Sequence, residues 1–498
     1  MTAMSARCKS LAMVLEGLVP SRPEMDIAIT DLTADSRAVR AGGCFVALAG
    51  TQHGATEFID QAADNGAAVI LTDTSVESSG TKVPLIGVPD IRAQLPTIAR
   101  RFFDDPSSKL RLVAVTGTNG KTTVAHTLAQ ALAILGEKAA YIGTLGHGKP
   151  DQLVAAANTT PDTVALNRCL AHFVDDNIGM CTLEASSHGL AQGRLEGIRC
   201  EVVVFTNLSR DHLDYHGDLV TYQSAKEKVF ALPGIRAAVV NIDDPVGQQF
   251  GTRYADKFDL WTCSVEGVSD QLSQARVSAR SVECSLGTTR FDLVVDGESA
   301  SVKSAVPGRV NVQNLLHSAA VLLSFGHSLD QVANAIARVS LPPGRLQRCD
   351  LGDNRPMVFI DYAHTPDSLR AVLRSLRELC EGTVTTVFGC GGERDKGKRR
   401  SMGEIASQLS DRCVITNDNP RSEDPQQIVD DIVAGIECTR REIILDRRSA
   451  IERAILESGT GDVVLLAGKG HESFQVLGHK RIPFSDMAVA RDVGMSLP

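Results

Sequence analysis

The chain has 498 residues, of which 43% are hydrophobic and 22% charged, and its formal net charge is -9. The length indicates about three domains, the negative charge argues against general nucleic-acid binding, and no apolar run approaches the ~20 residues of a membrane span. The first residues contain no cleavage-like site of a signal peptide, and twelve scattered cysteines without a CxxC pair indicate reduced thiols in a cytoplasm.

Short apolar runs and glycine-rich turns alternate in residues 1–97, which we expect to form a smaller N-terminal α/β domain. From Leu112 the pattern changes to a β-branched run, a glycine-rich turn and a stretch with helical apolar spacing at 121–135. Further buried strands are predicted at 139–145, 179–186, 201–207 and 237–243. Strands that alternate with helices predict a mostly parallel sheet in a central domain at 98–338.

Later parts of the chain contain a different strand pattern and a second α/β unit. Residues 277–295 alternate as antiparallel strands do, and we expect them to form a small side sheet. Helices are predicted from about Asn311 and at 329–338, and LPPGRLQR at 341–348 is typical of a linker. The predicted strands after the linker lie at 357–363, 383–389, 412–418 and 462–468. Residues 339–498 are therefore predicted to form a C-terminal Rossmann-like domain.

The strongest local motif is VTGTNGKTT at 115–123, between a predicted strand and a predicted helix. Glycines let backbone N–H groups approach phosphate oxygens, and the helix N-terminus favours an anion. Lys121 is expected to reach the β- and γ-phosphates of a nucleotide, which the loop alone leaves as ATP or GTP, and the Thr122 hydroxyl is expected to bind Mg²⁺. The common P-loop has a glycine where this chain has Val115, so this loop is a shorter variant. The nucleotide-binding residues expected here are Gly117, Thr118, Asn119, Gly120, Lys121, Thr122 and Thr123.

Two polar clusters follow predicted strands of the same sheet. Glu184 opens EASSHGL, and His212 lies in TNLSRDHLDYHG. Ligands of open α/β sheets bind at the carboxyl ends of the strands, so both side chains could complete a Mg²⁺ shell begun by Thr122. Taken singly, each residue is better explained without a metal, Glu184 as a helix-capping acid and His212 as a hydrogen-bonded loop histidine.

The order of the motifs resembles that of the Mur ligases, the ATP-dependent amide-forming enzymes of peptidoglycan synthesis. The resemblance covers nearly the whole chain. The motifs that carry it are GTNGKTT, NTTPD (158–162), EASSHGL (184–190), RDHLDYHG (210–217), DYAHTPDSL (361–369), GCGGERDKGKR (389–399), DNPR (418–421) and GKGHE (468–472).

The resemblance implies a three-domain fold, with a uridine-binding domain at 1–97, an ATP-binding domain at 98–338 and an amino-acid-binding domain at 339–498. It also implies that meso-diaminopimelate is added to UDP-N-acetylmuramoyl-L-alanyl-D-glutamate through an acyl phosphate, with formation of ADP and phosphate. We expect a cytoplasmic monomer without membrane insertion or nucleic-acid partner.

The resemblance assigns the chemistry to Lys121, Glu184, His212 and Lys226, with Mg²⁺ held by Thr122 and the last three of these. Lys226 matches a lysine that the family carbamylates with carbon dioxide, which would supply an anionic oxygen to the metal. From its neighbours alone, Lys226 would be a solvated helix lysine.

The resemblance also implies four groups of binding residues. They are Ser36, Thr51, Gln52 and His53 for uridine; Asn158, Thr159, Thr160, Ser186, Gln192 and Arg194 for the muramoyl peptide and pyrophosphate; Asn311, Arg345, Asp361 and His364 for the adenine and ribose side of ATP; and Arg394, Asp418, Asn419, Pro420, Arg421, Gly468 and Glu472 for the amino acid.

Arg421 is the residue expected to select diaminopimelate. The preceding turn residues hold it with little freedom, and its guanidinium suits the distal carboxylate that lysine lacks. The alternative is a surface salt bridge to Glu423 or Asp424. Rival functions are the same ligation with L-lysine, a folylpolyglutamate synthase, and a catalytically inactive scaffold protein.

Overall fold

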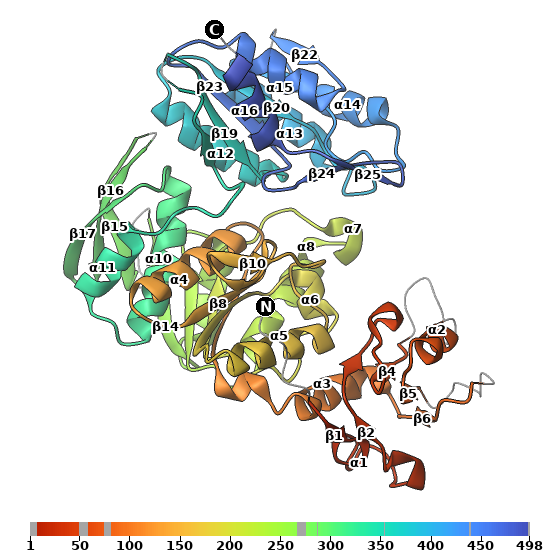
Figure 1. Ribbon diagram of the computed structural model, residues 1–498. Helices are drawn as coiled ribbons and strands as arrows, with labels where there is room; N and C mark the ends of the chain where they lie inside the picture. The colour runs from red at the N-terminus through yellow and green to blue at the C-terminus, as the bar shows by residue number, and fades with distance from the viewer. Residues whose placement is uncertain are drawn as a thin grey trace. The chain divides into compact units, whose positions relative to one another are not determined.

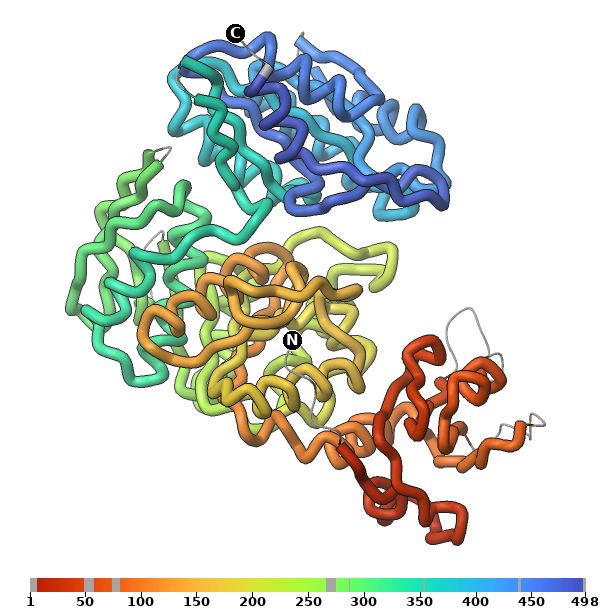
Figure 2. The backbone as a smooth tube through the Cα atoms, in the orientation of Figure 1, coloured from red at the N-terminus to blue at the C-terminus, as the bar shows by residue number. Residues whose placement is uncertain are grey.

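The computed structural model describes residues 7–48, 58–73, 81–265, 275–285, 287–352, 354–437 and 440–496. The chain divides into two compact units. Figures 1 and 2 show its helices and strands and the path of its backbone, coloured by residue number. One unit contains Met1–Ala114, Glu137–Glu201 and Lys228–Ile235, and the other contains Val115–Gly136, Val202–Glu227 and Arg236–Pro498.

The N-terminal segment contains a four-stranded parallel sheet in the order β3-β4-β5-β6. Its elements are β3 (Leu32–Thr33), β4 (Cys44–Val46), β5 (Val69–Thr72), β6 (Leu85–Gly87), α2 (Ile59–Asp64) and α3 (Ile91–Phe102), beside a small antiparallel pair, β1 (Lys9–Ser10) and β2 (Ala28–Ile29), and the short helix α1 (Leu11–Val14). Alternate residues of the strands are buried against α3 on one face and α2 on the other. The segment is thus a small α/β layer structure.

The largest sheet has eleven strands. Its strands are β7 (Arg111–Thr116), β8 (Ala139–Gly143), β9 (Gly146–Lys149), β10 (Gln152–Val154), β11 (Met180–Glu184), β12 (Val202–Phe205), β13 (Ala237–Asn241), β14 (Asp259–Ser264), β15 (Val277–Cys284), β16 (Thr289–Val295) and β17 (Glu298–Ser304). One run of neighbours is β10-β9-β8-β11, and another is β12 to β17 in chain order. The predicted buried strands of this region are therefore present within a residue or two of their expected ends.

The helices that accompany this sheet are α4 (Lys121–Ile134), α5 (Thr163–Asp175), α6 (Ser187–Ala191), α7 (Leu213–His216), α8 (Leu219–Glu227), α9 (Pro245–Tyr254), α10 (Arg309–Ser324) and α11 (Leu329–Ala337). Several are fixed at their start by a side-chain cap. The Asp162 carboxylate accepts hydrogen bonds from the first backbone amides of α5, and Ser328 and Gln331 form a capping box at α11.

The antiparallel strands at 277–304 correct one expectation. β15, β16 and β17 pair antiparallel, as the alternation predicts. They do not form a separate side sheet, because β15 pairs in parallel with the end of β14 and so extends the main sheet. Among the described residues, two pairs make this junction, Cys263 with Val277 and Ser264 with Ser278. A pairing of so few residues cannot be predicted from the alternation of apolar and polar residues.

The C-terminal segment folds around a six-stranded sheet in the order β18-β19-β23-β20-β21-β22. Its strands are β18 (Gln347–Cys349), β19 (Met357–Asp361), β20 (Val384–Phe388), β21 (Arg412–Ile415), β22 (Arg441–Ile443) and β23 (Val463–Ala467), and its helices are α12 (Pro366–Leu379), α13 (Lys398–Leu409), α14 (Pro425–Val433), α15 (Arg447–Leu456) and α16 (Asp486–Ser496). Only β18 is antiparallel to its neighbour.

Two hydrophobic cores cover the two faces of this sheet. The first buries residues of α12, α13 and α14, and the second buries residues of α15 and α16. Helices on both faces of a mostly parallel sheet confirm the predicted Rossmann-like architecture. A hairpin that the sequence pattern did not predict, β24 (Phe474–Leu477) with β25 (Lys480–Pro483), follows the last parallel strand.

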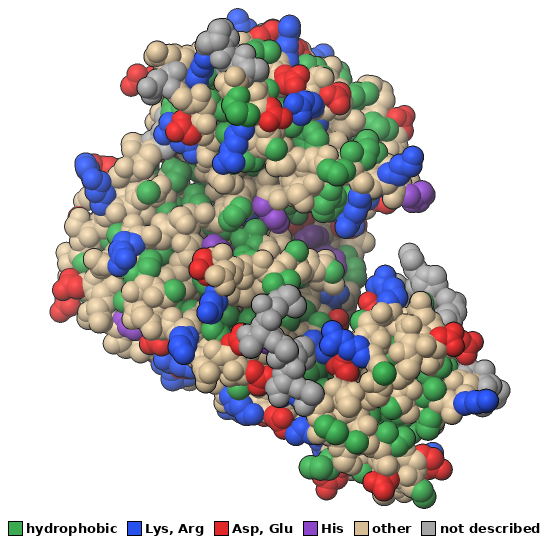
Figure 3. Space-filling view, viewed as in Figure 1, with side chains coloured by type: hydrophobic (Ala, Val, Ile, Leu, Met, Phe, Trp, Pro, Cys, Tyr) green, Lys and Arg blue, Asp and Glu red, His purple; other side chains and the backbone are tan. Residues whose placement is uncertain are grey.

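Charged side chains of both signs are interspersed on the face shown in Figure 3. The eleven cysteines within the described residues are all free, and most are buried. None of the helices in the described ranges is long and apolar enough to cross a membrane.

Candidate active site

The predicted phosphate loop lies between β7 and the N-terminus of α4. The loop is braced from the end of β12, where the Asn207 carbonyl accepts from the Thr118 amide at 2.8 Å and the Asn207 side chain accepts from the Asn119 amide at 2.9 Å. The Lys121 ammonium folds over the loop and donates to the carbonyls of Gly117 and Thr118 at 3.0 and 2.8 Å. These hydrogen bonds fix the conformation of the loop and hold the Lys121 ammonium against it.

Both glycines of this loop are required by space and by conformation. Gly117 and Gly120 have φ angles of 146° and 85°, which favour glycine. A Cβ on Gly117 would lie 1.9 Å from Thr206 Oγ1, and a Cβ on Gly120 would lie 2.6 Å from Asn314 Oδ1. A side chain at either position would therefore displace Thr206 or Asn314, so the close packing of this loop depends on both glycines.

Lys226 is buried at the end of α8, with 1% of its surface exposed. Its Nζ atom donates to the Gly117 carbonyl at 2.6 Å and lies 4.5 Å from the centre of the Tyr222 ring. Burial, and then the charge of Lys121, lower the pKa of Lys226 well below its ordinary value. The interpretation of Lys226 as a solvated helix lysine is therefore wrong, whereas its neighbour Lys228 is exposed.

His212 and His364 meet at a buried carboxylate that the sequence analysis did not single out. Asp211 Oδ2 lies 3.3 Å from Nε2 of His212 and 3.7 Å from Nε2 of His364. Burial raises the pKa of Asp211, but a hydrogen bond to His364 and the charges of His364, His212 and Lys398 outweigh it and lower the pKa below its usual range. Asp211 is part of the RDHLDYHG motif, but the sequence alone predicts no role for it.

The residues predicted for the adenine and ribose side of ATP differ in their hydrogen-bond partners. Arg345 donates through Nη2 to Thr122 Oγ1 at 3.0 Å, so it reaches the phosphate loop itself. The buried Asp361 carboxylate accepts from the amides of Leu346 and Ala363 at 2.6 and 2.7 Å, and burial raises its pKa. Asn311 is buried and bonds to the Pro307 carbonyl. Asp361 and Asn311 thus brace the backbone in this structure.

Glu184 ends β11 and is fully buried. Tyr141 and the backbone amide of Thr144 donate to its Oε1 atom, the latter at 2.9 Å, and Thr144 Oγ1 lies 3.2 Å from its Oε2 atom. The carboxylate is therefore part of a hydrogen-bond network, and the N-cap of the following helix α6 is Ser186, so the helix-capping alternative for Glu184 is wrong. Tyr141 and Thr144 belong to no motif recognised in the sequence.

The NTTPD and EASSHGL loops are joined beside Glu184. Thr160 Oγ1 donates to the Glu184 carbonyl at 2.7 Å and to Ser186 Oγ at 2.9 Å. Arg194 donates to the Thr160 carbonyl at 2.6 Å and to the Gln192 side chain. Thr159 Oγ1 lies 3.1 Å from Thr144 Oγ1, and Asn158 is exposed.

The structure thus brings Thr159, Thr160, Ser186, Gln192 and Arg194 together around Glu184. Ser36 donates instead to Gln61 within the N-terminal layer. The predictions for Thr51, Gln52 and His53 lie outside the described residues.

The predicted amino-acid site is a compact polar cluster at the carboxyl ends of β21 and β23. Asn419 donates to Glu472 Oε2 at 2.9 Å, and the buried Lys469 ammonium donates to both residues. Gly468 has a φ angle of 109°, and a Cβ there would lie 2.5 Å from Asp418 Oδ2. Burial raises the pKa of Asp418. Pro420 completes the turn. Lys469 lies inside the GKGHE motif, but the sequence did not indicate it as a residue of this site.

Arg421 is half-buried in a left-handed conformation, with φ 54°. Its Nη1 atom donates to the carbonyls of Gly392 and Asn419 at 2.7 and 3.4 Å. Burial, and then the charge of Arg394, lower its pKa. Within the described residues no carboxylate forms an ion pair with Arg421.

The expected alternative partners of Arg421 are engaged elsewhere. Glu423 accepts two hydrogen bonds from the buried Arg399, each 2.8 Å long, and forms an ion pair with Lys396. Asp424 caps α14. The predicted alternative, a surface salt bridge from Arg421 to Glu423 or Asp424, is thus wrong. The guanidinium lies near the Arg394 cation in a partly desolvated place, which suits an anionic ligand.

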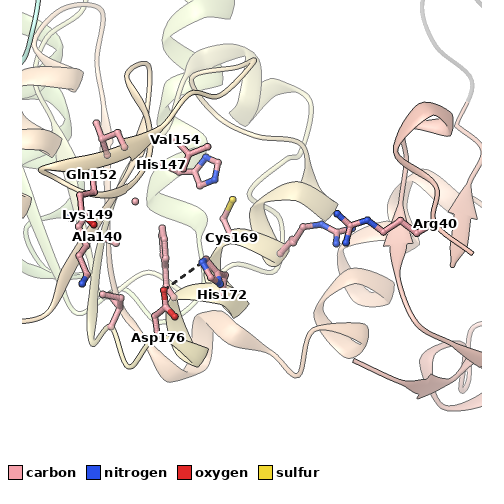
Figure 4. Close-up of a pocket in the computed structure, with 14 residues that line it drawn as sticks. Arg40, Ala140, His147, Lys149, Gln152, Val154, Cys169, His172 and Asp176 are labelled. Carbon is pink, nitrogen blue, oxygen red and sulfur yellow. Dashed lines mark ion pairs between the residues drawn. The ribbon is translucent and has the colours of Figure 1, made fainter. Parts of the chain in front are cut away.

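A cavity of about 710 Å³ lies between the β9–β10 hairpin and α5 (Figure 4). Its wall includes an ion pair between His172 and Asp176, whose atoms are 3.5 Å apart. Ala140 of β8 also lines it. No residue predicted from the sequence lines this cavity, so it does not contribute to the candidate site.

The donor set fits Mg²⁺. The hydroxyl of Thr122 and the carboxylate of Glu184 are each a hard oxygen donor of the kind that Mg²⁺ prefers, and His212 offers a ring nitrogen. The described residues contain no group of three or more His, Cys, Asp or Glu side chains placed to hold a metal by themselves. Mg²⁺ is commonly held by one or two carboxylates together with substrate phosphates, and such a site needs no larger protein cluster.

Comparisons with known proteins match nearly the whole chain to proteins of one family. Residues 115–322 match the family described as Mur ligase middle domain, and residues 344–470 match Mur ligase, glutamate ligase domain. A protein of Xylella fastidiosa (strain 9a5c) named UDP-N-acetylmuramoyl-L-alanyl-D-glutamate--2,6-diaminopimelate ligase is 43% identical over 488 residues, covering 97% of each chain.

A protein of the same name from Pseudomonas aeruginosa is 41% identical and covers 96% of this chain and 98% of its own length. A solved structure of a ligase of this name is 32% identical, covers 98% of this chain and 99% of the other, and has a TM-score of 0.69.

Proposed function

Because this chain belongs to the Mur ligase family, we propose that it is an ATP-dependent ligase that joins meso-diaminopimelate to UDP-N-acetylmuramoyl-L-alanyl-D-glutamate, forming ADP and phosphate. The observation that carries the choice of amino acid is the half-buried Arg421, which has no carboxylate partner among the described residues and lies near Arg394. Lysine, the rival substrate, offers no second carboxylate to this guanidinium.

The first chemical step brings two anions together. The side-chain carboxylate of D-glutamate attacks the γ-phosphorus of ATP, and ADP leaves as an acyl phosphate forms. Cations must offset the repulsion between carboxylate and phosphate. We assign this role to Lys121, whose ammonium already lies over the phosphate loop. We propose that Arg345, which donates to Thr122, assists at the same phosphates; its hydrogen bond to the phosphate loop supports this role.

Mg²⁺, when bound, would stabilise the negative charge that develops on the phosphate oxygens. Thr122, Glu184, His212 and Lys226 are the residues proposed to hold it. For Lys226 the proposal includes a carbamate, formed when its neutral amine adds carbon dioxide and loses a proton. Burial of Lys226 and the lowered pKa of its amine support this step, since only the neutral amine is a nucleophile.

In the second step the amine of diaminopimelate attacks the acyl carbon and phosphate leaves. The cluster of Asn419, Lys469 and Glu472 lies beside Asp418 at the end of the C-terminal sheet. We propose that Asp418 and Glu472 accept the distal ammonium, while Arg421 and Arg394 bind the distal carboxylate. Lysine would leave Arg421 without its partner, which is how a polar site rejects an analogue.

We further propose three working domains, at 1–97 for uridine, 98–338 for ATP and 339–498 for the amino acid. The matches of 115–322 and 344–470 to separate family domains support the second and third. The free cysteines support a cytoplasmic setting, where thiols stay reduced.

Ligation by the purified protein tests the proposal. ATP, Mg²⁺ and UDP-N-acetylmuramoyl-L-alanyl-D-glutamate are supplied with either meso-diaminopimelate or L-lysine, and phosphate release and product mass are measured. We expect a tripeptide product with diaminopimelate and far less with lysine. Equal use of lysine would overturn the substrate assignment, and absence of phosphate release with either amino acid would favour the scaffold alternative.

A further inference from the structure

The carboxylate of Glu184 is oriented by neutral hydrogen-bond donors from one short segment. The segment runs from β8 into the turn at 143–145. Tyr141 Oη donates to Glu184 Oε1, the Thr144 amide donates to the same oxygen at 2.9 Å, and Thr144 Oγ1 donates to Oε2 at 3.2 Å. These three donors are neutral, so they fix the plane of the carboxylate without adding a counter-charge of their own.

The direction of the Tyr141 side chain follows from the strand. Successive residues of a strand point to opposite faces. Ala140 lines the cavity beside α5 (Figure 4), whereas Tyr141 is fully buried and points toward Glu184. Its hydroxyl also accepts from the Leu145 amide at 3.3 Å, so it ties the turn to the carboxylate.

Gly143 shows how closely this segment fits around the carboxylate. A Cβ at this position would lie 2.2 Å from Glu184 Oε1 and 2.3 Å from Tyr141 Oη. Any side chain would therefore displace both groups. The segment also connects with the substrate loops, because Thr144 Oγ1 lies 3.1 Å from Thr159 Oγ1.

We propose that Tyr141 and Thr144 are positioning residues that aim the Glu184 carboxylate at the bound divalent cation. This inference rests on the proposed function, in which Glu184 holds that cation. Neither residue touches the reacting atoms. Their contribution is to keep Glu184 in its metal-binding orientation before ATP and metal arrive, so that binding does not have to order the side chain.

The test measures metal affinity without turnover. Mn²⁺ replaces Mg²⁺, ADP is present, and bound Mn²⁺ is followed by electron paramagnetic resonance in Tyr141→Phe and Thr144→Val. Loss of such supporting partners typically weakens metal binding about 10- to 100-fold, and we expect this for Tyr141→Phe. The Mg²⁺ concentration for half-maximal ligation should rise in parallel, with KM for the UDP-linked substrate nearly unchanged.

Tyr254→Phe is the matched control. Tyr254 also donates to a glutamate, at 2.8 Å to Glu227 Oε1, but that pair belongs to no proposed binding group. Its removal should leave Mn²⁺ affinity unchanged. Melting temperatures of all variants show whether any loss is one of folding.

The proposal is overturned if Tyr141→Phe and Thr144→Val both bind Mn²⁺ within about twofold of the parent, or if they lose affinity only in proportion to a lower melting temperature. Glu184→Gln separates this failure from failure of the proposed function. If Glu184→Gln loses Mn²⁺ and the Tyr141 and Thr144 variants do not, the positioning role alone fails. If Glu184→Gln binds Mn²⁺ as the parent does, the metal assignment fails and the positioning role with it.

Discussion

Replacing Arg421 by alanine should remove the preference for diaminopimelate. The guanidinium is half-buried, donates to two backbone carbonyls and has no carboxylate partner among the described residues. When the substrate binds, its distal carboxylate would form a charge-assisted pair in this partly desolvated place. Both arginine and alanine carry a Cβ, so the left-handed backbone at this position, with φ 54°, is no more strained in the variant.

The expected loss follows from the kind of pair that is removed. Truncating one member of a buried, hydrogen-bonded charge pair costs ~2–5 kcal/mol. Because Arg421 is only half-buried, we expect ~2–3 kcal/mol, which corresponds to about a 30- to 160-fold lower kcat/KM for diaminopimelate. Use of lysine should change far less, and KM for ATP hardly at all.

Phosphate release at several diaminopimelate and lysine concentrations measures the effect. Arg421→Lys keeps the charge and loses the planar fork, so it should retain part of the preference. Arg400→Ala is the control, since this arginine is exposed and, within the described residues, its ion pair is a surface one with Glu404. Equal losses for diaminopimelate and lysine would refute the reasoning, because Arg421 would then support the fold or the reaction in general.

Three further substitutions test other parts of the molecule. Lys121→Ala should lower kcat at least about 10²- to 10³-fold through loss of charge stabilisation at the phosphate, with an unchanged melting temperature; near-parent activity would remove the phosphate-loop assignment. Lys226→Ala should nearly abolish ligation while Lys228→Ala, at an exposed position, is mild, and similar behaviour of the two variants would count against the carbamate. Asp486→Asn should lower the free energy of unfolding by ~3–5 kcal/mol, because it leaves the fully buried Arg447 without its counter-charge. Asp492→Asn, which breaks a surface pair, should cost ~0–1 kcal/mol in the same denaturant titration.

The sequence alone determined the kind of protein and the location of its loops. Continuous apolar, β-branched runs predict buried strands because both faces of a parallel sheet are covered, and the strands at 111–116, 180–184 and 463–467 lie where those runs are. The phosphate loop was equally visible, since its glycines are dictated by local backbone conformation. Ordered motifs then sufficed to identify the family.

Only the tertiary structure decided how individual side chains are partnered. Lys226 looks like a solvated helix lysine until α8 packs it beneath the phosphate loop. Arg421 has two acidic neighbours in sequence, yet Glu423 accepts hydrogen bonds from Arg399 of α13. Tyr141 belongs to no motif, and its contact with Glu184 spans 43 residues.

The physical reason for this division is the range of the interactions. Strand propensity, glycine conformation and turn chemistry depend on a few adjacent residues, so the sequence records them directly. Burial, desolvation and ion pairing depend on which segments pack together, and these can be hundreds of residues apart. The charge state of Lys226 and the availability of Arg421 for an anion are properties of that packing.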